Sequence, residues 1–343
     1  MQSLTLTRPD DAHLHLRDGA ALASVLPHTA RVFARAVVMP NLLPPITDTA
    51  LATAYRGRVL KALPKGSDFE PLMTLYLTDG TGPEEIARAK RSGFVCGVKY
   101  YPAGATTNSG AGVTSIERAY PALDAMQEHD LALLVHGEVA TPGVDVFDRE
   151  RVFLETVLAD IARRFPRLRI VVEHVTTREA VDFVLTGGPG IAATITAHHL
   201  LYNRSAMFTG GLRPHYYCLP VLKREEHREA LVRAATSGNP KFFLGTDSAP
   251  HARADKEAPC GHAGMYTAHA AIELYAEVFE RARALDKLEA FASFHAADFY
   301  RLRRNRGTIT LRKENWSVPG EMPFGTATLV PLRAGESVGW RLA

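Results

Sequence analysis

Cysteine is scarce in this chain and is not arranged in pairs. The three cysteines, Cys96, Cys218 and Cys260, are far apart among 343 residues, and no two form a Cys-x-x-Cys motif. An odd number of widely separated cysteines predicts neither a disulfide framework nor a zinc ribbon. Disulfide-stabilised secreted domains and thiolate-rich metal sites are therefore not expected.

The sequence also lacks a targeting segment and any long hydrophobic run. The first residues, MQSLTLTRPDD, contain no basic stretch followed by an apolar one, so no signal peptide is predicted. The longest apolar stretches, such as residues 131–135, fall far short of the ~20 residues that cross a bilayer. The expected location is the cytoplasm.

An excess of charge of one sign is missing as well. Forty Lys and Arg residues stand against 37 Asp and Glu, a formal net charge of +3. A balanced charge argues against nucleic acid or a membrane as the binding partner. The expected partner is therefore a small-molecule substrate. The one dense basic run, residues 301–306, is interpreted as a solvated helix end.

Short apolar runs alternate with longer amphipathic segments along most of the chain. The runs are rich in Val, Ile, Leu and Phe without strict alternation, as in parallel strands buried on both faces. Eight such runs predict a (β/α)8 barrel, and an open doubly wound sheet is the alternative, but no Gly-rich phosphate turn follows the first run. The runs are residues 12–15, 35–39, 72–77, 94–100, 131–136, 169–174, 191–197 and 242–246.

The remaining segments predict helices and a short extension. Residues 114–128 and 148–165 have helical patterns, and Thr114 followed by Glu117 resembles a capping box. Residues 308–311 and 328–332 look like short strands. We therefore expect one domain over residues 1–343, with a barrel at about 8–300, an extension at 301–343 packed on it, and no N-terminal β-sandwich.

Ionisable residues recur at the carboxyl ends of five of the predicted strands. In a barrel these strand ends converge on the active site. His13 and His15 are two residues apart, so both imidazoles lie on the same side of an extended chain. Each residue alone has a structural explanation, but their common position favours a joint role. Nitrogen and carboxylate ligands without thiolate suit Zn²⁺ or a similar ion. The six residues are His13, His15, Lys99, His136, His174 and Asp247.

Lys99 does not fit a metal site as an ammonium, because that group has no lone pair. A barrel lysine can form a Schiff base with a carbonyl substrate. Alternatively its neutral amine can react with CO2 to give a carbamate whose oxygens bridge two cations. The four histidines expected nearby exceed what a Schiff-base site needs, which favours the carbamate.

Several motifs together resemble the dihydroorotases of the short, bacterial-type class in the amidohydrolase superfamily. The similarity runs in order from about residue 8 to residue 264. The motifs are DDAHLHLRD, VVMPNLLPP, GVKYYPAGATTNS, LLVHGE, EHVTT and FLGTDSAPHAR.

The resemblance implies two zinc ions and a reaction. One zinc would be held by His13, His15 and Asp247, and the other by His136 and His174, with carboxylated Lys99 (N6-carboxylysine, formed from CO2) and a hydroxide between them. Asp247 would be the general base in the reversible hydrolysis of (S)-dihydroorotate to N-carbamoyl-L-aspartate, a step of de novo pyrimidine (UMP) biosynthesis.

The resemblance also implies a substrate site and a mobile loop. Arg17, Asn41 and His251 would clamp the substrate carboxylate, with His136 and main-chain groups near Leu219 and Ala263 as further contacts. Residues 105–110, with Thr106 and Thr107, resemble a loop that closes over the substrate. His198 and His199 are interpreted as structural rather than ligating. Such enzymes are often dimers, so a homodimer is one expectation, although no interface pattern is visible.

Three other functions would use parts of the same pattern. A hydantoinase or allantoinase would share the metal ligands, but we expect a longer N-terminal segment before His13 in those enzymes. A non-catalytic scaffold of the same fold would typically have lost ligands. A Schiff-base aldolase would use Lys99 without metal, which borohydride trapping and metal analysis would distinguish.

Overall fold

Eight parallel strands form the centre of the structure, a computed structural model that describes residues 2–343. They pair in chain order from β2 to β9. The last strand returns to the first through a parallel bridge between Leu14 and Ser248, so the sheet closes into a barrel. The strands are β2 (Asp10–Leu14), β3 (Arg35–Val38), β4 (Glu70–Tyr76), β5 (Val95–Tyr100), β6 (Ala132–His136), β7 (Ile170–Glu173), β8 (Ile191–Ile195) and β9 (Phe242–Leu244).

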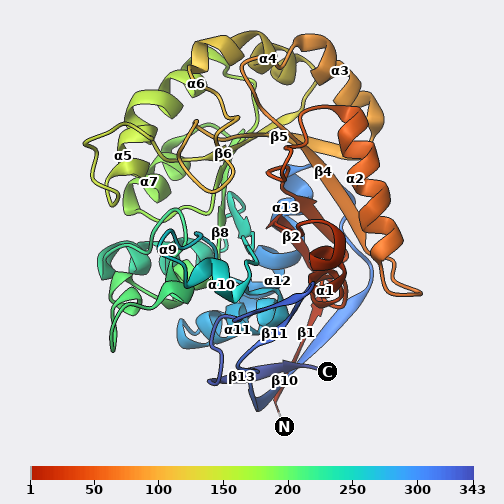
Figure 1. The fold of residues 1–343 in the computed structure, drawn as a ribbon, viewed down its shortest axis with the longest axis vertical. Coiled ribbons are helices and arrows are strands. Elements are labelled where there is room, and N and C mark those ends of the chain that lie inside the picture. The colour runs from red at the N-terminus through yellow and green to blue at the C-terminus, as the bar shows by residue number, and fades with distance from the viewer. Residues whose placement is uncertain (1) are drawn as a thin grey trace.

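Helices surround this barrel on the outside (Figure 1). The prediction of a (β/α)8 barrel is therefore confirmed, and each predicted run contains one of the eight strands to within two residues at either end. Among residues 2–343, no helix is both long and apolar enough to span a membrane. The main helices are α1 (Gly19–Ala30), α2 (Thr49–Ala62), α3 (Pro83–Ser92), α4 (Ile116–Glu128), α5 (Arg149–Phe153), α6 (Ala159–Arg164), α7 (Arg178–Thr186), α8 (Ala197–Leu201), α9 (Glu225–Thr236), α10 (Arg253–Lys256), α11 (Ala271–Arg281), α12 (Leu285–Glu289) and α13 (His295–Phe299).

The strands are buried on both faces, which explains their unbroken apolar character. Along β6, for example, Leu133 and Val135 join the large cluster under the helices, whereas Ala132 and Leu134 join a smaller cluster inside the barrel. His136 ends the same strand with the parity of the interior residues. Alternation along β6 therefore directs this imidazole to the inside.

A β-bulge in the first barrel strand, β2, interrupts the alternation of inward and outward side chains next to His13. Between Asp11 and Leu14 the register against β3 shifts by one residue. Ala12 belongs to the interior cluster and Leu14 to the outer one. An extra residue in a strand re-aims the side chains that follow, and here it lets His13 face the site directly after an inward Ala12.

The two ends of the chain meet in a small sheet outside the barrel (Figure 1). β1 (Ser3–Thr7) pairs antiparallel with β10 (Thr308–Ser317), which pairs with β13 (Ser337–Leu342). A separate hairpin joins β11 (Met322–Phe324) and β12 (Ala327–Leu329). The two predicted strand pieces lie in or overlap β10 and β12, but β1 and β13 were not predicted.

The helix at residues 114–128 forms, but its predicted capping box does not. α4 begins after Ser115, which is the N-cap residue and makes no side-chain capping bond. The Thr114 hydroxyl and N–H both bind the Asp79 carboxylate instead. Both donors of Thr114 are thus taken up by a carboxylate from the β4–α3 connection, while Glu117 accepts from the Ser115 hydroxyl, so the prediction was wrong in this detail.

Candidate metal centre and active site

A small enclosed cavity of about 30 Å³ lies at the carboxyl ends of the barrel strands. Lys99 does not line it; this side chain is fully buried, with its Nζ 5.1 Å from the centre of the Tyr101 ring. Every other residue predicted for the site lines the cavity, and three further residues do so too. The lining is His13, His15, Arg17, Asn41, Tyr101, Thr106, Thr107, His136, His174, Leu219, Asp247, Ala249, His251, Ala263 and Gly264.

Four imidazoles and one carboxylate that line this cavity form a connected row of neighbours. Asp247 Oδ1 lies 3.1 Å from His15 Nε2 and 3.5 Å from His13 Nε2. Ligand atoms of these three residues all lie within 4.8 Å of one another, which is the spacing that a shared metal ion needs. The His174 ring centre is 5.0 Å from that of His13 and 4.9 Å from that of His136, so the second pair adjoins the first.

Left-handed backbone turns two of these residues toward the cavity. His174 has φ of 41° and Asp247 has φ of 43°, a region that non-glycine residues rarely adopt. Such a conformation costs roughly 1–3 kcal/mol, and it persists where the surrounding structure enforces it. Because Glu173 already faces the barrel interior, the turn at His174 lets two consecutive side chains serve the same site.

In three of the imidazoles, the ring nitrogen that points away from the other candidate ligands (the outer nitrogen) contacts an oxygen acceptor. His13 Nδ1 lies 2.8 Å from Glu173 Oε2, and His136 Nε2 lies 2.9 Å from Glu138 Oε2. Similarly, His15 Nδ1 lies 2.8 Å from Asn41 Oδ1. These oxygens accept a hydrogen, so each ring carries its proton on the outer nitrogen and keeps a lone pair on the other. The imidazoles are thus preset as metal ligands.

Glu173 and Glu138 were not predicted from the sequence, although a signal was present. Both carboxylates are fully buried, and each lies within two residues of a predicted ligand in or next to an apolar strand. Buried carboxylates are rare unless they are paired. Thr194 Oγ1 on β8 donates to Glu173 and accepts from the His174 N–H, which extends the network to a third strand.

Asp11 and Gly245 fix β9 against β2. The Asp11 carboxylate accepts from the N–H of His13 and from both the N–H and the hydroxyl of Thr246. A side chain at Gly245 would place its Cβ 2.7 Å from Thr194 Cβ and 3.0 Å from His13 Cβ. The close approach of the strands that carry His13 and Asp247 therefore requires glycine at this position.

Burial sets the protonation of the central groups. It lowers the pKa of His15 to about 4 and holds the pKa of His174 well below its usual value, so both rings are neutral. Burial alone would raise the pKa of Asp247, but the adjacent His15 imidazole and the other neighbouring imidazoles hold it well below its usual range. Neutral imidazoles beside an ionised carboxylate are the forms that bind a cation.

The amine of Lys99 is unpaired within the described part of the chain. Its Nζ is buried, and no group among residues 2–343 makes a hydrogen bond with it. Burial lowers the pKa of Lys99 to about 8, although the negative charges of Glu173 and Asp247 act to raise it. An unpaired buried polar atom is costly. The site therefore fits divalent cations and a modified lysine. It offers an unpaired amine among the described residues and imidazoles with a free ring nitrogen, and no thiolate lines it.

At the opposite side of the cavity Arg17 is held in a fixed orientation. Its Nε donates to the Pro250 carbonyl at 2.9 Å, and its Nη2 donates to His251 Nε2 at 3.0 Å. Burial and the positive charges of Arg17 and Lys256 lower the pKa of His251 to about 2, so this ring is neutral. Asn41 also lines the cavity, but its Oδ1 is occupied by His15, which leaves the amide nitrogen as its free donor.

The loop at residues 105–110 covers the cavity. Thr106 and Thr107 line it, and the Asn108 side chain donates to the Asn41 carbonyl at 3.2 Å. The Asn108 carbonyl in turn accepts from the Tyr76 hydroxyl at 3.2 Å. These two hydrogen bonds tie the loop to β4 and to the segment that follows β3.

His198 and His199 do not line the cavity. Both are fully or almost fully buried, and His199 is held by the Thr196 hydroxyl and the Pro220 carbonyl. The same carbonyl accepts from the thiol of Cys218. Ligand atoms of His198, His199 and Cys218 lie within 4.8 Å of one another, yet two of the three are already engaged with Pro220. These contacts favour a structural role for His199 and Cys218, whereas neither ring nitrogen of His198 has a hydrogen-bond partner among residues 2–343.

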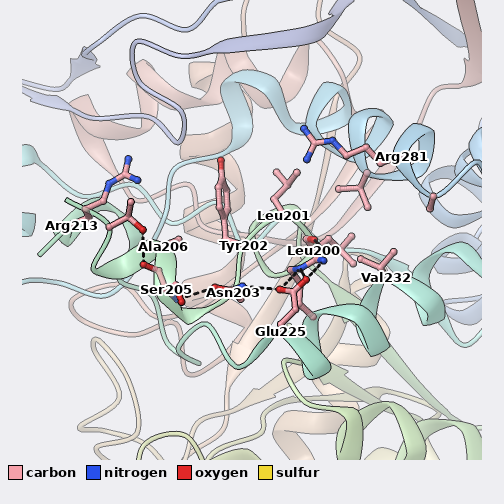
Figure 2. A pocket seen from close by; sticks show the side chains of 14 residues that line it. Leu200, Leu201, Tyr202, Asn203, Ser205, Ala206, Arg213, Glu225, Val232 and Arg281 are labelled. Carbon is pink, nitrogen blue, oxygen red and sulfur yellow. Dashed lines mark hydrogen bonds and ion pairs between the residues drawn. The ribbon is translucent and has the colours of Figure 1, made fainter. Parts of the chain in front are cut away.

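A larger open hollow of about 660 Å³ between α8, α9 and α11 carries no comparable chemistry. Its carboxylate, Glu225, is already bound by Arg228 and by Asn203. Figure 2 shows the contact between Asn203 and Glu225. Its lining residues include neither histidine nor cysteine. The enclosed cavity at the strand ends is therefore the candidate active site.

Comparison with known proteins agrees with this geometry. The sequence model of the Amidohydrolase family matches residues 10–318, and the chain belongs to that family of metal-dependent hydrolases. It is 67% identical over 340 residues to a dihydroorotase of Cupriavidus taiwanensis, covering 99% of each chain. These comparisons place the chain among the dihydroorotases of that family.

Two solved structures extend the similarity to the whole fold. The dihydroorotase of Campylobacter jejuni matches with a TM-score of 0.91 at 38% identity, over 99% of this chain and 97% of that one. The dihydroorotase of Saccharomyces cerevisiae in complex with 5-fluoroorotic acid matches with a TM-score of 0.92 at 34% identity, over 100% and 99%.

Proposed function

We propose that the enclosed cavity catalyses the reversible hydrolysis of the cyclic amide of (S)-dihydroorotate to N-carbamoyl-L-aspartate, a step of pyrimidine biosynthesis. The observation that carries this proposal is the juxtaposition of four imidazoles and Asp247 in one cavity, with the buried Lys99 amine behind the cavity-lining Tyr101 and without a hydrogen-bond partner among residues 2–343. A carboxylate-binding set, Arg17 and His251, lines the same cavity. Together they suit a cyclic amide that carries a carboxylate.

Two zinc ions would complete the site. His13, His15 and Asp247 would hold one, His136 and His174 would hold the other, and Lys99, as its carbamate with CO2, would bridge them. When bound, such cations polarise an amide carbonyl and lower the pKa of a water molecule from ~15.7 towards neutrality. The outer contacts of Glu173, Glu138 and Asn41 support this assignment, because they leave the inner nitrogen of each ring free.

Asp247 is the group that moves the proton. Its carboxylate accepts the proton of the attacking water as the amide opens, and in the biosynthetic direction the protonated form returns it as water is lost. Its Oδ1 lies 3.1 Å from His15 Nε2, so the carboxylate stands beside an imidazole that would share a cation with it. Arg17, Asn41, His251 and the main chain at Leu219 and Ala263 would meanwhile hold the substrate carboxylate and ring.

The test is metal content measured together with turnover of dihydroorotate on the purified protein. We expect two zinc ions per chain and activity that disappears when they are removed and returns when they are added back. Turnover of a hydantoin or of allantoin in preference to dihydroorotate would contradict the proposed substrate. A metal-free chain with no turnover would instead point to a scaffold.

We further infer that residues 1–343 act as a single domain in the cytoplasm and assemble as a homodimer. The pairing of β1 with β10 supports the first point, since it ties both chain ends to one barrel. Light scattering on the purified chain would give the assembly size, and a monomer at all concentrations would exclude the dimer.

Replacing Arg17 with lysine should weaken substrate binding without affecting the metal centre. Lysine keeps the charge but loses the planar pair of donors, and hydrogen bonds to charged groups contribute about 1.5–3 kcal/mol. We therefore expect catalytic efficiency to fall roughly tenfold to hundredfold, with normal zinc content. As a control, wild-type enzyme should discriminate strongly against dihydrouracil, which lacks the carboxylate. Equal use of both substrates would refute the clamp.

Removing both hydroxyls of the covering loop should slow turnover. The double variant Thr106→Ala, Thr107→Ala loses two groups that line the cavity, and net hydrogen bonds contribute about 0.5–1.5 kcal/mol each. A closing loop also excludes water from the reaction. We expect turnover to fall between roughly fivefold and a hundredfold at unchanged zinc content. Kinetics like those of the wild type would remove this loop from the mechanism.

A further inference from the structure

A buried lysine at the end of α10 binds three main-chain carbonyls. Lys256 is only 4% exposed, and its Nζ donates to the carbonyl oxygens of Tyr217, His262 and Gly264 at 2.7, 2.8 and 2.7 Å. An ammonium has three hydrogens, so all of its donors are used. Among residues 2–343, no carboxylate forms an ion pair with it. The three carbonyls, together with the Tyr217 ring whose centre lies 5.7 Å from Nζ, compensate its charge.

These carbonyls belong to the two segments that form the substrate side of the cavity. Tyr217 lies two residues before Leu219, and His262 and Gly264 flank Ala263. Leu219, Ala263 and Gly264 all line the cavity. The N–H of Gly264 also donates to the Tyr217 carbonyl at 3.0 Å, so the ammonium sits where the two segments join.

The contact with His262 orients the next peptide N–H. In a trans peptide the carbonyl and the N–H point in opposite directions. Because the His262 carbonyl faces Lys256, the N–H of Ala263 faces away from it. No group among residues 2–343 accepts a hydrogen bond from this N–H. A free donor thus lies on a residue that lines the cavity.

The backbone around this lysine has no room to shift. A Cβ at Gly261 would lie 2.7 Å from the Lys256 carbonyl oxygen. At Gly264, where φ is 149°, a Cβ would lie 2.7 Å from the Ala249 carbonyl oxygen and 2.9 Å from His251 Cδ2. The segment that Lys256 binds is therefore packed directly against the Arg17 partner His251.

We propose that Lys256 is a positioning residue that sets the spacing of the main chain at Leu219 and Ala263 and aims the Ala263 N–H at the bound carboxylate-bearing ring. This role rests on the proposed function. Lys256 makes no contact with the substrate in this assignment. It acts through the peptide units that its ammonium holds, so its loss should affect substrate affinity more than the chemical step.

The variant Lys256→Met tests this on the zinc-loaded full-length protein. Methionine approximates the aliphatic stem of lysine but leaves three carbonyls without their donor. We expect KM for dihydroorotate to rise roughly tenfold to hundredfold, with kcat changed less than about threefold and two zinc ions retained. The dissociation constant of 5-fluoroorotic acid, measured by calorimetry without turnover, should rise by a similar factor.

Lys241→Met is the matched control. The Lys241 ammonium also binds main-chain carbonyls, those of Val184 and Gly187, but at the opposite end of the barrel, just before β9 begins. The Lys241→Met variant should have a lower midpoint of thermal unfolding, while its KM for dihydroorotate and its affinity for 5-fluoroorotic acid stay at wild-type values. An equal loss of affinity in this control would mean that general destabilisation, not positioning, explains the Lys256 result.

Gly261→Ala provides a second variant if Lys256→Met does not fold. The added Cβ pushes on the Lys256 carbonyl and should displace the same segment with the ammonium intact, so KM should again rise at normal zinc content. Wild-type KM and ligand affinity in either folded variant would overturn the role of Lys256. Failure of the wild type to bind 5-fluoroorotic acid or to use dihydroorotate would instead overturn the proposed function.

Discussion

His174→Ala is expected to lose bound zinc and to reduce turnover of dihydroorotate by roughly a thousandfold or more. The imidazole is buried, neutral and in contact with both His13 and His136, so its loss removes one of few ligands. Cations supply several kcal/mol of transition-state stabilisation, which corresponds to this change in rate. His13→Ala should behave in the same way. Zinc content and steady-state kinetics measured on one preparation would check both.

His198→Ala offers a control for the removal of a buried imidazole. His198 is fully buried near the same strand ends but does not line the cavity. It should lower stability while leaving two zinc ions per chain and most of the activity. Loss of a zinc ion in this variant would show that His198 is a ligand. Wild-type turnover that survives exhaustive chelation, with no metal left, would refute the metal mechanism.

Lys99→Ala should bind metal poorly and lose nearly all activity, again by roughly a thousandfold or more. The reason is the environment of its amine, which is buried among neutral imidazoles with no hydrogen-bond partner. Desolvation favours the neutral amine, which can take up CO2, and the resulting anion would be held by both cations. Added short carboxylic acids such as acetate should restore part of the zinc content and activity, because they can occupy the same bridging position.

Lys99→Arg separates this mechanism from a purely electrostatic one. Guanidinium keeps a positive charge but neither reacts with CO2 nor ligates a cation, so acetate should not rescue this variant through the lysine position. Labelled CO2 and carbon NMR on the wild type should detect a carbamate. A bare amine at full zinc occupancy and full activity would refute the bridge. Borohydride trapping of a substrate adduct on Lys99 would instead support a Schiff base.

The local pattern of the chain predicted the barrel well because each strand is buried on both faces. Burial of both faces requires unbroken apolar runs, and these are visible in a single sequence. The prediction was poorer where a partner distant in sequence decides the structure. β13 was missed because its ladder depends on β10, and the cap of α4 was misassigned because Asp79 binds Thr114.

The same distinction between local pattern and distant contacts applies to the candidate site. The sequence by itself determined which candidate ligands the chain offers and where along the strands they occur. These residues, His13, His15, Lys99, His136, His174 and Asp247, all lie at or near strand ends. It also determined, through its motifs, the resemblance to the dihydroorotases. Both kinds of information are local, because strand period and motif spacing involve residues that are near one another in the chain.

Only the tertiary structure decided how those ligands are held. The Glu173 contact to His13 joins residues 160 positions apart, and the Asp11 contact to Thr246 joins residues 235 positions apart. The left-handed backbone at His174 and Asp247, and the three carbonyls around Lys256, likewise depend on neighbouring segments. Such contacts arise when the barrel closes and brings distant strand ends together, and no local pattern of residues encodes that closure.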